Sequence, residues 1–266
     1  MKKSAWRLVI LLIVLSGAAG TAALYYGIGR STLLRPTTLP SPLAYQQTPS
    51  PHVSPLFSPA QVNSRPAISP LSQPLVTLPA EVNLAIPFTA QAPHRNWELP
   101  YQEFCEEASV LMAMSYVQNQ AIPNADFANQ RLLEIQAFEE KRFGYYEDTT
   151  VEETAIILRE YYKNDRVDVA YEPTIQDIKE ALGTGKVVIV PAAGRSLPNP
   201  YYRQPGPLYH MLVIKGYTQD GKFITNDPGT RNGADFIYEQ AVLLNAVHDW
   251  NNGQVEQGRK AMIIVG

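Results

Sequence analysis

Prolines divide this chain of 266 residues into a part that excludes regular structure and a part that permits it. Eleven of the 22 prolines lie between Leu34 and Pro79, among many serine, threonine and glutamine residues. Each proline removes a backbone donor and restricts the residue before it, so neither a helix nor a central strand can run through this stretch. We therefore predict a disordered linker over residues 31–79 and a folded domain over residues 80–266.

The N-terminus has the pattern of an export or anchoring signal. Lys2, Lys3 and Arg7 precede an uncharged, mostly apolar stretch, Leu8–Ile28, which is about 31 Å long as a helix and thus long enough to cross a bilayer. Residues 1–30 are therefore predicted to be a transmembrane anchor, with the rest of the chain extracytoplasmic at the cell membrane. The alternative is a signal peptide cleaved among the small residues at 17–23, which predicts a secreted protein.

Composition excludes several functional classes. The net charge is −3 and no basic block follows the first few residues, which argues against nucleic-acid binding. A single cysteine rules out an intrachain disulfide and any Cys-x-x-Cys motif. Because His52, His94 and His248 are scattered, no metal site is predicted either. The sequence does not predict an oligomeric state.

Periodicity and capping signals predict helices first and antiparallel strands afterwards, which indicates the α+β class. Helices are expected to begin at Cys105 and at Asn124, and another is expected over 239–247. Two further helices are expected to begin at the threonine caps Thr150 and Thr174. Strands are expected over residues 82–87, 187–190, 209–217, 222–226, 234–238 and 261–265.

The chain's only cysteine, Cys105, lies where a loop is expected to become an apolar helix. A helix N-terminus favours a thiolate, and its backbone N–H groups can hold an oxyanion. His210 opens a predicted strand, and Asp227 follows the return strand of the hairpin. A nucleophile, a base and a carboxylate that orients the base form a catalytic triad. Asn226 and Asp227 point to opposite faces of a continuous strand, so Asn226 is the alternative third member.

Four blocks in this order resemble the C39-like cysteine peptidases, a papain-like family. The blocks, which span most of the folded part from Val82 to Val265, are Pro87–Pro93 with Trp97, Cys105–Ser109, His210–Tyr217 and Asn226–Thr230. The resemblance implies a papain-like fold with N-terminal helices packed on an antiparallel sheet. It also implies that Cys105 is the nucleophile, His210 the general base, Asp227 its orienting group and Gln91 the oxyanion-hole amide.

The expected function is thus an extracytoplasmic thiol hydrolase that cleaves a peptide or isopeptide bond in a peptide or protein substrate, without a cofactor. One alternative is a hydrolase or acyltransferase of cell-wall peptides on the same fold. Another is a catalytically inactive surface binding module, which the Glu106-Glu107 pair favours because nearby carboxylates oppose a thiolate.

Overall fold

The structure, a computed structural model, describes residues 38–46 and 78–266. The predicted anchor at residues 1–30 and most of the predicted linker lie outside the described residues. Within the described ranges, no helix has both the length and the apolarity needed to cross a membrane.

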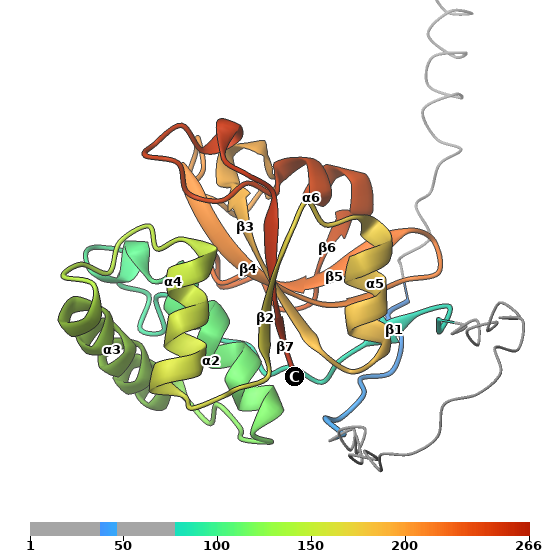
Figure 1. The fold of residues 1–266 in the computed structure, drawn as a ribbon, viewed down its shortest axis with the longest axis horizontal. Helices are drawn as coiled ribbons and strands as arrows, with labels where there is room; N and C mark the ends of the chain where they lie inside the picture. The colour runs from blue at the N-terminus through green and yellow to red at the C-terminus, as the bar shows by residue number, and fades with distance from the viewer. Residues whose placement is uncertain (1–37, 47–77) are drawn as a thin grey trace, which may run out of the picture. The chain divides into compact units, whose positions relative to one another are not determined.

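A single antiparallel sheet forms the centre of the folded domain (Figure 1). Its strands lie in the order β2-β7-β3-β4-β5-β6, and β1 pairs with β4 outside this path. The central strands β3 and β4 are buried along their whole length, because helices cover both faces. The strands are β1 (Val82–Asn83), β2 (Val167–Tyr171), β3 (Val187–Ala193), β4 (Tyr209–Tyr217), β5 (Lys222–Asn226), β6 (Phe236–Glu239) and β7 (Ala261–Val265).

Helices α2, α3 and α4 gather on one side of the sheet, with α5 and α6 on the other (Figure 1). The predicted α+β class, with N-terminal helices packed on an antiparallel sheet, is therefore confirmed. The helices are α2 (Cys105–Val117), α3 (Ala125–Arg142), α4 (Val151–Ile156), α5 (Ile175–Gly183) and α6 (Gln240–Ala246); a π-helical segment, Ile157–Tyr161, continues α4.

The helix starts follow the sequence signals. Thr150 and Thr174 both form capping boxes, in which the threonine side chain accepts from the N3 backbone and the N3 carboxylate accepts from the cap. Helix α2 is different: it is buried from Cys105 to Tyr116, all round its axis. It packs between the sheet and α3, so even its polar residues, among them Glu106 and Glu107, are buried.

Within the predicted linker, Leu43 and Tyr45 contact the folded domain. We call residues 38–46 the strap. Leu43 donates its N–H to the carbonyl of Asn83 and accepts from Ala85, both at 2.7 Å. The Tyr45 ring packs edge-on against Tyr116. Asn83 Nδ2 donates to the carbonyl of Pro40 at 2.9 Å, and Arg166 donates to the Tyr45 hydroxyl at 2.7 Å. Proline restricts regular structure but does not prevent such single contacts.

Two strands differ from the sequence prediction. The first strand covers only Val82–Asn83 instead of residues 82–87, because the chain then leaves the edge of the sheet. Strand β2 was not predicted: it pairs with β7 at the sheet edge, and only one of its five residues is buried, so its apolar signal is weak.

Candidate active site

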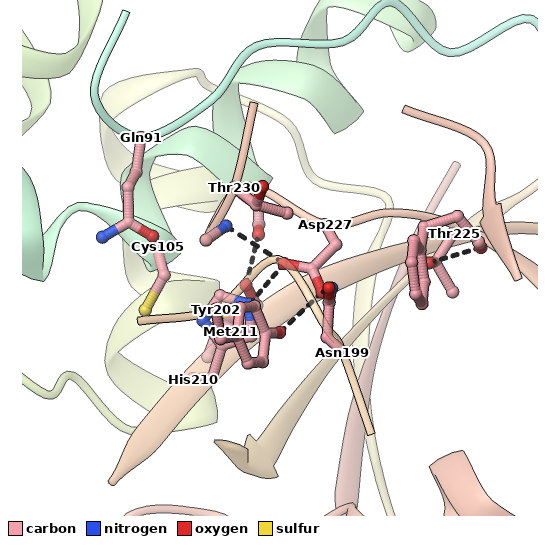
Figure 2. Close-up of polar contacts among 12 residues, drawn as sticks. Gln91, Cys105, Asn199, Tyr202, His210, Met211, Thr225, Asp227 and Thr230 are labelled. Atoms are coloured by element: carbon pink, nitrogen blue, oxygen red, sulfur yellow. Dashed lines mark hydrogen bonds and ion pairs between the residues drawn. The ribbon is translucent and has the colours of Figure 1, made fainter. Parts of the chain in front are cut away.

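The site forms where the start of α2 meets the start of β4. The Ser109 hydroxyl, one turn into α2, donates to the carbonyl of Met211 at 3.2 Å and so joins the two elements beside Cys105 and His210. The loop before α2 is held by the Gln91 backbone N–H, which donates to the carbonyl of Pro228 at 3.0 Å. These contacts bring together four residues predicted from sequence: Gln91, Cys105, His210 and Asp227 (Figure 2).

His210 and Asp227 form a buried pair. His210 Nε2 lies 2.8 Å from Asp227 Oδ1, and both side chains are closed to solvent. The strands β4 and β5 end their pairing at Val213 and Asn226, so Asp227 stands just beyond the sheet and turns back toward the imidazole. With Nε2 held by the carboxylate, Nδ1 is the ring nitrogen left for a proton from a nucleophile.

The alternative third member, Asn226, is not beside His210. Its amide donates to the carbonyls of Ile86 and Pro87, at 3.1 and 3.3 Å, and its oxygen accepts from the Asp235 backbone. Asn226 thus fastens the segment after β1 to the end of β5. Neighbouring residues in an extended chain point to opposite faces. Asp227 therefore points to the imidazole, and Asn226 points to the backbone carbonyls.

Gly229 allows the turn after Asp227 to close over the imidazole. A Cβ at this position would lie 2.8 Å from His210 Cε1 and 3.0 Å from Tyr202 Cε1. The Gly229 N–H also donates to Asp227 Oδ1 at 3.0 Å. The glycine in the Asn-Asp-Pro-Gly sequence therefore serves close packing against the base.

The second oxygen of Asp227 is surrounded by donors that the sequence did not identify as site residues. Asn199, Tyr202 and Tyr238 donate to Oδ2 at 3.0, 2.6 and 2.8 Å (Figure 2 shows Asn199 and Tyr202 around the carboxylate). Tyr202 belongs to the proline-rich loop before β4, and only tertiary proximity assigns it to the carboxylate.

These contacts determine the charge of the pair. Burial by itself raises the pKa of Asp227, but the adjacent His210 and the hydrogen bonds from His210, Tyr202 and Tyr238 outweigh it and hold the pKa below its ordinary value. Burial and the neighbouring carboxylate raise the pKa values of Tyr202 and Tyr238, which therefore stay protonated donors. Asp227 thus remains an anion that fixes His210.

Cys105 points its sulfur toward the side of the site where His210 lies (Figure 2). It is 6% exposed. The thiol donates to Glu106 Oε2, with 2.9 Å between sulfur and oxygen. Burial, followed by the charge and the hydrogen bond of Glu106, raises the pKa of the Cys105 thiol well above its ordinary value. A raised pKa favours the thiol form of Cys105 over the thiolate.

A group of buried acids lies behind Cys105. Burial, with the repulsion of a neighbouring carboxyl, raises the pKa values of Glu106 and Glu107 well above the ordinary value. Burial likewise raises the pKa of Glu139, on α3, to about 9, although its contact with Glu107 opposes the increase. Burial near other acids raises the pKa of Asp148 to about 6. A pKa of about 9 keeps Glu139 protonated at neutral pH, whereas Asp148, with a pKa of about 6, is mostly ionised there.

Gln91 lies beside Cys105, but its amide donors face elsewhere (Figure 2). Nε2 donates to the carbonyls of Tyr101 and Gln102 at 3.0 and 2.7 Å. Turning the amide over would set its oxygen against two carbonyls, so this orientation is fixed by its partners. An oxyanion role for Gln91 therefore requires that a substrate oxygen replace one of these carbonyls, and it stays a prediction.

His94 and His248, the other histidines that the structure describes, have local partners. His94 lies 3.1 Å from Asp126, with both side chains well exposed, and His248 Nδ1 bonds to the carbonyl of Gly258 at 2.7 Å. Within residues 38–46 and 78–266, no cluster of His, Cys, Asp and Glu is suited to a metal ion. A surface hollow of about 490 Å³ is bordered by α5, β2 and β7 and includes none of the candidate residues.

The chain was compared with known protein families and structures. A family model, described as the Peptidase_C39 like family, matches residues 83–253, more than half of the chain and all of the candidate site. No curated protein matches the chain.

Solved structures with a similar arrangement include a putative C39-like peptidase from Bacillus anthracis, with 16% identity and a TM-score of 0.45 over 70% of this chain and 98% of that one. A prointerpain A fragment from Prevotella intermedia matches with 13% identity and a TM-score of 0.35, over 52% and 41% of the two chains. The active interpain A cysteine protease of the same organism matches with 18% identity and a TM-score of 0.32, over 53% and 55%.

Proposed function

Because the chain belongs to the C39-like peptidase family, we propose that it is a thiol hydrolase in which Cys105 attacks a peptide or isopeptide carbonyl. The observation that carries this proposal is the buried 2.8 Å contact between His210 Nε2 and Asp227 Oδ1. It fixes the ring so that Nδ1 is available to the thiol, whose sulfur points to the same side of the site (Figure 2).

The chemistry follows from this arrangement. The Cys105 thiol gives its proton to His210 Nδ1, and the thiolate adds to the carbonyl carbon. The first backbone N–H groups of α2 stabilise the oxyanion, with Gln91 as the proposed second donor. The imidazolium then protonates the leaving amine, and neutral His210 takes a proton from water as it attacks the thioester. Asp227 keeps the ring oriented and balances its positive charge through both steps.

The test is hydrolysis of a mixed peptide library by the full chain, compared with Cys105→Ala and His210→Ala. Loss of either group from a working Cys–His pair is expected to lower kcat/KM by roughly 10³-fold or more. A peptide aldehyde should add one mass equivalent, at Cys105 alone. Equal turnover by all three proteins would sink the proposal.

One observation favours a second candidate, an inactive binding module: the resting thiol is buried and its pKa is raised. If the domain is an inactive binding module, none of the three proteins hydrolyses the library. Cys105→Ala should then bind library peptides as tightly as the native chain does. Peptidoglycan stem peptides belong in the same screen, since selective turnover of these would identify the cell-wall hydrolase or acyltransferase instead.

We also propose that the domain acts outside the cytoplasm, held at the membrane by residues 1–30. The support is the apolar stretch Leu8–Ile28 behind a positive flank. Full-length protein should fractionate with membranes and be digested by external protease, whereas a chain lacking residues 1–30 should remain in the soluble fraction. A shorter, soluble mature protein would indicate cleavage and secretion.

A further inference from the structure

A carboxyl group that the proposed reaction does not use is in direct contact with its nucleophile. Glu106 Oε2 accepts the Cys105 thiol proton at 2.9 Å. Glu106 is 1% exposed, and its other oxygen, Oε1, accepts no hydrogen bond from any other residue that the structure describes. A buried carboxyl with one partner is costly unless it is protonated or has a task.

The two protonation states of Glu106 have opposite effects on Cys105. As a carboxylate, it accepts the S–H proton and repels a negative sulfur, so the thiol is retained. As a carboxylic acid, it becomes a donor, and an O–H group can hydrogen-bond to a thiolate. The same contact thus keeps the nucleophile inactive in one state and stabilises its reactive form in the other.

The surroundings of Glu106 favour the protonated state. On α2 it faces Cys105 and Glu107; Glu139 acts from α3 and Asp148 from the loop before α4. From β4 it faces the Tyr209 hydroxyl, which donates to Asp249 and to a backbone carbonyl. None of these groups is a cation, and burial and Glu107 both raise the pKa of Glu106.

We propose that Glu106 is a positioning residue that sets the reactivity of Cys105 by reversing the direction of one hydrogen bond. In the reactive form Glu106 keeps a proton taken from solvent, and its O–H group donates a hydrogen bond to the thiolate sulfur, while the thiol proton moves to His210 Nδ1. One S–H bond breaks, one N–H bond forms, and no electrons are exchanged. The inference rests on the proposed function, since it needs His210 as the acceptor.

The sign of the pH dependence follows. A carboxyl whose folded-state pKa is raised is protonated below that pKa and ionised above it. The reactive form therefore exists at lower pH and is lost as Glu106 ionises. Reactivity of the native chain should pass through a maximum and then decline with rising pH, before the unassisted thiolate forms in strong base.

The test is the rate of iodoacetamide alkylation against pH for the full native chain and for Glu106→Gln. Because the chain has one cysteine, the signal belongs to Cys105. Glutamine keeps a donor and cannot ionise, so its profile should rise once and stay high. We expect the two rates to agree within about threefold near pH 5.5, and the variant to be about tenfold faster or more at the pH where the native rate has declined.

Two controls separate this role from a structural one. Glu106→Ala removes the donor and should be about tenfold slower than Glu106→Gln near pH 5.5. Glu180→Gln, an exposed acid on α5, should follow the native profile. Coincident profiles for the native chain and Glu106→Gln would overturn the proposal. If the variant does not fold, a native profile that rises through a single inflection overturns it equally.

The His210→Ala variant distinguishes failure of the role of Glu106 from failure of the proposed function on which that role rests. If this variant alkylates and hydrolyses like the native chain, the proposed function fails. If it loses both while Glu106→Gln matches the native chain, only the role of Glu106 fails.

Discussion

Five hydrogen bonds converge on the carboxylate of Asp227: two on Oδ1, from His210 and Gly229, and three on Oδ2, from Asn199, Tyr202 and Tyr238. A buried carboxylate with this many donors stays charged at low cost. The residue that orients His210 is therefore itself held by side chains from the loop before β4 and from β6.

Tyr202→Phe tests this support. Loss of one hydrogen bond to a buried charge costs about 1.5–3 kcal/mol, so we expect a lower unfolding temperature and several-fold lower turnover. The diagnostic readout is the acid limb of the pH–rate profile, which should move to higher pH because the donor that lowers the pKa of Asp227 is gone. Tyr201→Phe is the matched control, because Tyr201 is 54% exposed. An unmoved acid limb would assign Tyr202 to packing alone.

The candidate residues could be predicted because each lies beside a local signal: Cys105 at a helix start, His210 at a strand start, Asp227 after a hairpin. The residues around them carry no such signal. Asn199 and Tyr202 belong to a loop whose course depends on tertiary contacts, and Tyr238 resembles any aromatic strand residue. The orientation of the Gln91 amide depends on two backbone carbonyls, at residues 101 and 102. It could not be predicted from the sequence either.

At the scale of elements, β4 connects the site to the opposite edge of the fold. Its first residues carry His210, and its last residues pair with β1, where Gly216 faces Asn83. A Cβ on Gly216 would stand 2.1 Å from the carbonyl oxygen of Val82 and 2.9 Å from Asn83 Cα. Only glycine allows the two backbones to come this close.

Gly216→Ala should therefore destabilise the domain by overpacking, by about 1–3 kcal/mol. Denaturant unfolding followed by tryptophan fluorescence measures the change. Gly266→Ala is the control, since its nearest neighbour, Lys186 Cγ, would be at an ordinary 3.7 Å. Equal midpoints for the two variants would mean that β1 moves aside at little cost.

Elements with strong local signals were predicted well, and weak ones were not. The two threonine capping boxes and the β4–β5 hairpin depend on residues that are close together in the sequence. Strand β2 depends on β7, nearly a hundred positions later, and its exposed face hides its apolar pattern. The helix that begins after Thr150 changes to π-helical turns after Ile156, and no local sequence signal predicts this change.

At the scale of the whole molecule, the buried acids make stability depend on pH. Glu139 is protonated in the folded state up to about pH 9, whereas an unfolded chain gives up this proton near pH 4.5. Between these values the folded state binds more protons, so stability is greatest below the unfolded pKa and falls as pH rises. The proposed reactivity of Cys105 and the stability of the domain thus decline in the same direction.

We expect the unfolding temperature to be roughly 5–10 °C lower near pH 8.5 than near pH 5.5, which corresponds to a few kcal/mol. Scanning calorimetry at several pH values measures the slope. Glu139→Gln should flatten it, because glutamine has no proton to lose, whereas Glu140→Gln, the exposed neighbour, should leave it unchanged. A pH-independent unfolding temperature in the native chain would show that the acids ionise without penalty.

The strap gives the segment between residues 46 and 78 two attached ends, one at each side of β1. While that segment is intact, the strap and its site share one chain, and the effective concentration that holds them together is set by the connection. A single proteolytic cut within residues 47–77 would convert this into an ordinary bimolecular complex between two pieces. The contacts of Pro40, Leu43 and Tyr45 with the domain would then hold the two pieces together, so the pieces should separate on dilution.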